Sequence, residues 1–446
     1  MIDLALAYYL SFAAILFFAA MVRPKLFWPI LFFGSIVGSG LMATGVTIFD
    51  EIYVFSVVVA GLLLFMAGKA GLHRGKDRFA SVWHQAIFYV FILYLSWEAL
   101  RGAMILSSPG KIRWIIFFVM IGVIGFLAAK KVFFNADGKN LVLSLAAGTS
   151  LYLAYYLGYG IFTESFRGLS RFSIQPGEWS TPAYALFPLI AGIPAAMILI
   201  CAQGKHFYYQ STGWLVVILG MLAGIYYDSR IAIVFIATGL LVCLPQIGIK
   251  KIAPVLFLAA IGLLSAIAVS DSSKMVRLAD NFGTDLVATS RGLVLWDDSN
   301  KDIDRKVHIK AAILSINSDV VALLFGYGYR MHGYIIGPYL RELFMQRGFP
   351  EMAEKVTDNE STEGFTAFLV DTGLFGMFLL VANFIFAGYR LIIQKNNPYR
   401  LILLVSLVFA FLWLPIINIL DVVLFYLLIM PNGLLFQLSG YPFRRG

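Results

Sequence analysis

Long apolar runs alternate with short polar connections along most of this chain. A helix needs roughly 17–25 mostly apolar residues to cross a bilayer, and runs of that length predict 12 or 13 transmembrane helices. They lie near residues 4–21, 26–47, 52–69, 85–106, 112–130, 141–162, 182–202, 212–227, 230–249, 252–270, 365–389, 401–418 and 420–437. Pro415 and Pro431 interrupt the final pair, which leaves the count open at the C-terminus.

Two connections are longer than a turn, and they set the predicted domain organisation. The first covers residues 163–181, and the second covers 271–364 and is polar enough to form a small domain. The pattern therefore predicts a bundle of about ten spans over 1–270, an extracytoplasmic loop domain over 271–364, and C-terminal spans over 365–446.

The long loop has a pattern of its own. Residues 303–316 place apolar side chains at helical spacing, which predicts an amphipathic helix, and residues 335–347 predict a second short helix. Gly326 and Gly328 lie between these segments and favour a turn over a dinucleotide-binding loop, since no third glycine or strand accompanies them.

The composition agrees with a membrane protein. Of the 446 residues, 60% are hydrophobic and only 13% are charged, against about 25% charged residues in soluble domains. A soluble fold this apolar has too few polar side chains to cover its surface. The predicted fold class is therefore an all-α polytopic membrane protein with one long extracytoplasmic loop.

The net charge of +9 reports orientation more than a partner. Basic residues gather in alternate connections, which the positive-inside rule places in the cytoplasm. The predicted cytoplasmic connections hold about 17 of the 34 basic residues and about two acids. The N-terminus is then outside and the C-terminus inside, and a nucleic-acid partner is not expected.

Three arginines on the predicted outer side are candidate anion ligands: Arg171, Arg230 and Arg291. Each lies next to apolar sequence, where a charge is costly and often functional. A guanidinium binds phosphate oxygens in a bidentate manner, so the three would suit a diphosphate at the lipid–water boundary. The alternative is an ordinary ion pair with a neighbouring acid, such as Asp228 beside Arg230.

A general base is also needed if the protein is an enzyme. His308 and His332 are the two histidines predicted to face outward, and an imidazole can accept a hydroxyl proton near neutral pH. His332 lies in the glycine-rich turn, whereas a solvated helix face explains His308 better. Carboxylates are the alternative bases: Asp358, Glu360, Glu363 and Asp371.

Other signals favour structure over chemistry. Glu98 and Arg101 are three residues apart within a predicted span and form an expected intrahelical pair. The chain lacks the P-loop, HExxH and GxSxG motifs. Asp297 and Asp298 are adjacent and are not spaced to hold a divalent ion. We therefore expect neither a metal nor a cofactor.

These motifs, in this order, resemble the O-antigen ligase and O-antigen polymerase superfamily of membrane glycosyltransferases, over roughly residues 140–395. The similar segments are Arg171-Phe-Ser with the downstream Pro182-Ala183, Ser229-Arg230, Ser290-Arg291 with Trp296, Phe325-Gly-Tyr-Gly328, and Asp371-Thr-Gly-Leu-Phe-Gly376. One departure is clear. Many members have a His-Asn pair about nine residues before the acidic position, and this chain has Ser361-Thr362-Glu363 there. The resemblance then leaves His332 or Glu363 as the base.

The resemblance implies a glycosyltransferase of the bacterial cytoplasmic (inner) membrane with an outward-facing site. Its donor would be a glycan on a polyprenyl diphosphate, and its acceptor a second glycan or a lipid. A polysaccharide polymerase, with a chain-length regulator protein as a partner, is the first expectation. An O-antigen ligase that transfers glycan to lipid A core is the second. A flippase or transporter is the non-enzyme alternative, although the candidate charges gather at one face and not at the midplane.

Overall fold

The protein is helical wherever its structure can be described. The computed structural model describes residues 4–43, 61–62, 82–105, 138–163, 189–201, 207–226, 230–247, 253, 303–346, 348–356, 364–393 and 399–413. Helices account for nearly all of these residues, and no strand occurs among them. The all-α fold class is therefore confirmed for this part of the chain.

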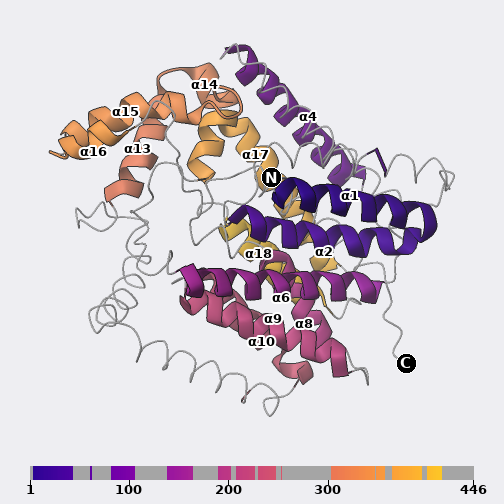
Figure 1. Ribbon diagram of the computed structural model, residues 1–446. Coiled ribbons are helices and arrows are strands. Elements are labelled where there is room, and N and C mark those ends of the chain that lie inside the picture. The colour runs from indigo at the N-terminus through magenta and orange to yellow at the C-terminus, as the bar shows by residue number, and fades with distance from the viewer. Residues whose placement is uncertain are drawn as a thin grey trace, which may run out of the picture.

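The helices follow the apolar runs of the sequence (Figure 1). They are α1 (Leu4–Val22), α2 (Pro24–Ala43), α4 (Val82–Ile105), α6 (Gly138–Thr163), α8 (Leu189–Cys201), α9 (Phe207–Tyr226), α10 (Arg230–Ile247), α13 (Ile303–Asn317), α14 (Val320–Phe325), α15 (His332–Gln346), α16 (Pro350–Lys355), α17 (Gly364–Ile393) and α18 (Arg400–Trp413). Four further apolar runs lie almost entirely outside the described residues: 52–69, 112–130, 252–270 and 420–437.

Two of the described helices are long and apolar enough to cross a membrane, judged by length and composition. They are Ala86–Ile105 within α4 and Phe365–Ile393 within α17. Shorter apolar helices include Leu189–Cys201 and Ala232–Ile247. The sequence-based count of 12 or 13 spans stays a prediction.

The long helices pack around one large core. Helices α2 and α6 lie against each other, α6 contacts α8 and α9, and α10 contacts α8, α9 and α18. Helix α17 joins α18 to α4, so α4 closes one side of the bundle. Phe27, Phe91, Tyr152 and Phe235 are among the largest side chains of the fully buried core. Such dense burial holds the bundle helices in fixed positions.

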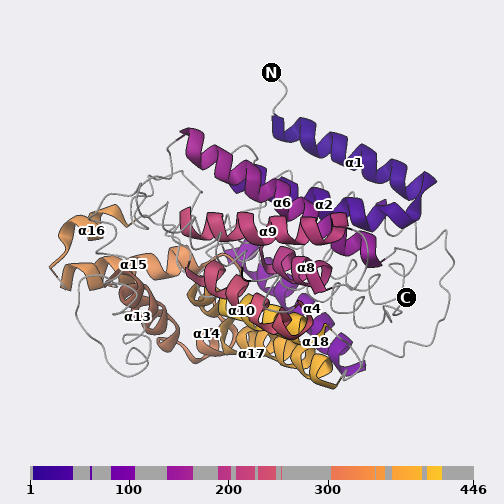
Figure 2. The same cartoon turned by 90° about the horizontal axis from the view of Figure 1, so that it is seen from below.

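The short helices form a second, smaller core on the N-terminal part of α17. Val307 of α13, Leu340 of α15 and Ala353 of α16 are buried together with Val370 of α17. Figures 1 and 2 both place α13, α15 and α16 together at one end of the molecule. The helix predicted over 303–316 is confirmed, and the second helix begins at His332, three residues before the predicted start.

Helix α4 separates an exposed apolar stripe from a buried one. Val90, Leu93, Trp97, Leu100 and Met104 are exposed and recur every three or four residues. On the opposite stripe Phe91, Leu95, Glu98, Ala99 and Ala103 are buried. This spacing is that of one helix with two faces, and it places a carboxyl group among apolar side chains on the face that meets α17.

Candidate functional site

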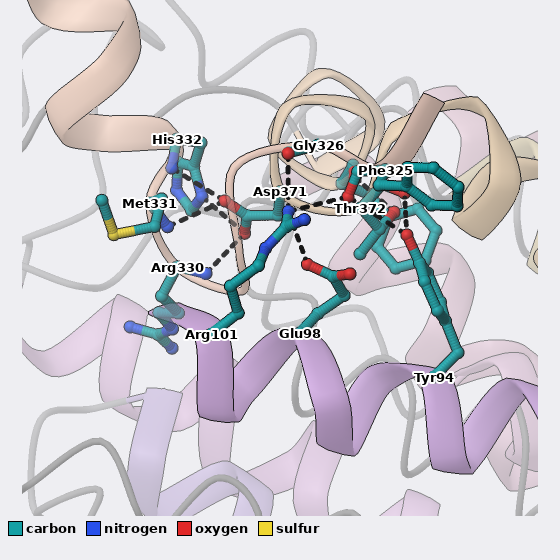
Figure 3. A network of polar contacts seen from close by, with 11 residues as sticks. Tyr94, Glu98, Arg101, Phe325, Gly326, Arg330, Met331, His332, Asp371 and Thr372 are labelled. Atoms are coloured by element: carbon teal, nitrogen blue, oxygen red, sulfur yellow. Dashed lines mark hydrogen bonds and ion pairs between the residues drawn. The ribbon is translucent and has the colours of Figure 1, made fainter. Parts of the chain in front are cut away.

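Three segments that are far apart in the sequence meet at one point of the fold. They are the C-terminal half of α4, the turn between α14 and α15, and a kink in α17. Figure 3 shows their side chains converging around Asp371. Two of the glycine-containing motifs of the sequence take part, since Gly326 and Gly328 lie in the turn and Asp371 and Gly373 lie at the kink.

Asp371 is the hub of the site. Its Oδ1 accepts the backbone N–H groups of Met331 at 2.8 Å and His332 at 2.7 Å. Its Oδ2 accepts the backbone N–H of Arg330 at 2.7 Å and lies 2.9 Å from Nδ1 of His332. The residue is almost fully buried. Four charge-assisted contacts compensate a buried carboxylate for its lost hydration.

The carboxylate also caps a helix. Met331 and His332 donate their N–H groups at the point where α15 begins, and these groups have no partner within the helix. A negative charge at a helix N-terminus is favourable because the helix dipole is positive there. Asp371 therefore fixes the start of α15 and the direction of its first side chain, His332.

Glycines permit the close approach of the three segments. Gly326 has φ +70 and ψ −165, and Gly373 has φ +64 and ψ −170, a region that is essentially restricted to glycine. A Cβ on Gly373 would lie 2.5 Å from the nitrogen atoms of Phe325 and Gly326. A Cβ on Gly102 of α4 would lie 2.6 Å from the carbonyl oxygen of Tyr329. The backbones touch directly, with no room for side chains.

Helix α4 holds the turn from the other side. The Tyr94 hydroxyl donates to the carbonyl of Thr372 at 2.6 Å and to that of Phe325 at 3.1 Å. The Arg101 guanidinium donates to the carbonyl oxygens of Phe325 at 2.9 Å and Gly326 at 2.5 Å. It also lies 2.7 Å from the buried carboxylate of Glu98. The backbone carbonyl of Glu98 accepts the N–H of Tyr329 at 2.9 Å.

Arg330 adopts a backbone conformation unusual for its type. Its φ is +64, the only positive value at a non-glycine residue in the described ranges. A left-handed conformation costs an L-residue about 1–2 kcal/mol. The hydrogen bond from its N–H to Asp371 and those of the two following residues hold it there. Such conformations gather at functional sites.

The Asp371–His332 pair is the chemically competent feature of this site. The His332 side chain keeps 17% of its surface exposed, whereas that of Asp371 keeps 4%. A carboxylate that accepts the Nδ1–H of an imidazole leaves Nε2 with its lone pair and fixes the ring orientation. His332 can then accept a proton at Nε2 from a group that reaches it from the exposed side.

The predicted site residues have different outcomes. His332 lies at the centre of the described site, and Arg230 is the first residue of α10. Arg171, Arg291 and Glu363 lie outside the described residues. The proposed convergence of the three arginines on one diphosphate therefore stays a prediction, as does the alternative base Glu363.

Sequence reasoning missed part of the site. It treated Asp371 as an alternative base, whereas Asp371 hydrogen-bonds His332 and three backbone N–H groups. It predicted Glu98 and Arg101 to be an intrahelical pair, which the structure confirms, but it missed that Arg101 and Tyr94 bind the turn. The sequence signal that could have found this contact is Glu98, a carboxyl group within an apolar predicted span.

The site has the groups for proton transfer. Among the described residues, no three His, Cys, Asp or Glu side chains are placed to hold a metal ion. A comparison with known protein families and a search of curated proteins both found no match to this chain. The proposed function therefore rests on the chain's own residues.

Proposed function

We propose that this chain is a polytopic membrane glycosyltransferase that joins polyprenyl-diphosphate-linked glycan repeats at the outer face of a bacterial cytoplasmic membrane. The single observation that supports it best is the Asp371–His332 pair beside two helices of membrane-spanning length. The motif resemblance supplies the reaction class.

The membrane assignment is supported by the surface of the helices. Large apolar side chains are exposed on α1, α4 and α17, among them Phe18, Leu93, Phe378 and Ile385. Exposed apolar area on this scale is unusual for a soluble monomer. By the positive-inside rule, the basic residues that precede α4 and follow α17 would lie in the cytoplasm, which supports an outer-face location for the site.

The proposed step is an inverting displacement. The acceptor hydroxyl passes its proton to Nε2 of His332, and its oxygen forms a bond to the anomeric carbon of the donor glycan. The bond from that carbon to the diphosphate oxygen breaks, and the polyprenyl diphosphate leaves with the electron pair. Asp371 stabilises the resulting imidazolium. Arg171, Arg230 and Arg291 are the proposed ligands for the leaving diphosphate.

The glycan profile of a strain that lacks this chain tests the proposal. Single repeats on the lipid A core would identify a lost polymerase, and polymer retained on the carrier lipid would identify a ligase instead. Lipid-linked repeats confined to the inner leaflet would identify a flippase and overturn the proposal. An unchanged profile would overturn it as well.

Complementation tests the role of the histidine. We expect His332→Ala to fail to restore polymer while the protein remains in the membrane. His308→Ala is the matched control, because His308 lies on α13 and not in the turn that binds Asp371. Full restoration by His332→Ala would remove His332 as the base.

A further inference from the structure

Helix α14 exposes four of its six apolar side chains. Val320 is 71% exposed and Val321 is 59% exposed, and Leu324 and Phe325 are also exposed. Ala322 is the one buried residue of the helix. The helix contains no charged residue, so water would meet a purely apolar surface on a segment beside the site.

This surface continues onto the helices of membrane-spanning length. The ring of Phe325 lies 6.1 Å from that of Phe375 on α17, which lies 5.0 Å from the ring of Tyr94 on α4. Phe375 is itself exposed, and so are its neighbours Leu374 and Phe378. The apolar face of α14 is therefore one part of a larger apolar surface that includes α17.

The position of α14 along the two helices gives its depth. Tyr94 and Arg101, which both bind the carbonyl of Phe325 at the end of α14, precede the end of their span at Ile105 by 11 and four residues, or about 16 and 6 Å at 1.5 Å per residue. Thr372, the other partner of Tyr94, follows Phe365 by seven residues, or about 10 Å. Half of a hydrocarbon core is about 15 Å. Both helices thus place the C-terminal end of α14 about 6–16 Å below their own ends.

Protein groups bind part of the polar backbone at both ends of α14. At its start, the Asp319 side chain accepts the N–H of Val321 at 2.9 Å. At its end, the carbonyl oxygens of Phe325 and Gly326 accept hydrogen bonds from Arg101, and that of Phe325 also accepts one from Tyr94. Water satisfies such groups at the ends of exposed soluble helices. In a bilayer the protein must satisfy them itself.

From these observations we infer that the exposed face of α14 contacts lipid acyl chains of the outer leaflet, so that the neighbouring Asp371–His332 pair lies at the depth of those chains. The inference rests on the proposed membrane location. A site at this depth would favour a substrate whose reacting bond lies next to a lipid tail, because such a substrate reaches the site from the membrane interface and not from bulk water.

Spin labels at matched positions test this contact. Single cysteines are introduced at Val321 and at Met345, in a background with Cys201→Ala and Cys243→Ala. Val321 and Met345 have the same exposed fraction, 59%, but Met345 lies in the last turn of α15, toward α16. Collision with oxygen, which concentrates in hydrocarbon, is compared with collision with a water-soluble nickel chelate in phospholipid vesicles.

We expect the oxygen-to-nickel collision ratio to be several-fold higher at Val321 than at Met345. A second label at Val320 guards against local misfolding and should give the same high ratio. Equal ratios at Val321 and Met345 would overturn the lipid contact, and so would protection of Val321 from both reagents, which would indicate a protein partner. The experiment measures no glycan transfer. A high ratio at Val321 together with an active His332→Ala variant would therefore refute the proposed chemistry alone.

Discussion

The direct backbone contact between the turn and α17 makes Gly326 a position where one methyl group should be costly. In Gly326→Ala the new Cβ would overlap the carbonyl of Asp371 and lie 2.5 Å from the nitrogen of Thr372, closer than the 3.0 Å that real Cβ contacts respect. The atoms met are backbone atoms of a packed helix, which cannot rotate away. Overpacking of this kind costs about 1–3 kcal/mol.

The conformation of the residue adds to that cost. With φ +70 and ψ −165, alanine would be held in a region that costs a non-glycine residue about 1–3 kcal/mol. We expect the two effects together to lower the free energy of unfolding by about 2–6 kcal/mol. The assay is titration of the detergent-solubilised protein with sodium dodecyl sulfate, followed by circular dichroism.

Two other glycines separate the contributions. Gly348 has φ +78, but an added methyl group would meet nothing within 4 Å, so Gly348→Ala reports the backbone strain alone, about 1–2 kcal/mol. Gly158 lies in α6, where an added Cβ would meet nothing within 4 Å and φ is not positive. Gly158→Ala should therefore be neutral or stabilising. A Gly326→Ala protein as stable as Gly348→Ala would refute the direct backbone contact.

The remaining predictions concern the other residues of the site. Asp371→Asn should lower glycan transfer by about 10²–10⁴-fold, because an amide donates to Nδ1 of His332 and leaves the proton on Nε2; an unchanged transfer rate in membranes would count against the pair. Arg101→Ala should lower the free energy of unfolding by about 3 kcal/mol because it leaves a buried carboxylate unpaired. Adding Glu98→Gln should recover part of that loss in the same titration, and no recovery would contradict the ion pair. Arg230→Ala should remove long-chain glycan without removing the protein from membranes, and a normal chain-length ladder would refute its role.

The helices themselves were readable from local pattern. Apolar runs of the right length predicted α4 and α17 with ends within a few residues of those observed, because a continuous apolar run of about 20 residues is too long for a typical strand and favours a helix. The spacing of apolar residues predicted α13, and Gly326 and Gly328 predicted a turn. The kink in α17 was not predicted, since a single glycine within an apolar run has no distinct local signature.

The sequence by itself determined the all-α class, the position of most helices and the identity of His332 as a candidate base, because composition and periodicity are local properties. Only the tertiary structure decided the pairing of His332 with Asp371, which are 39 residues apart. It also decided that Tyr94 and Arg101 bind a turn more than 220 residues away. Such contacts depend on which helix faces meet and on glycines that let two backbones touch, and one sequence read along its length contains neither.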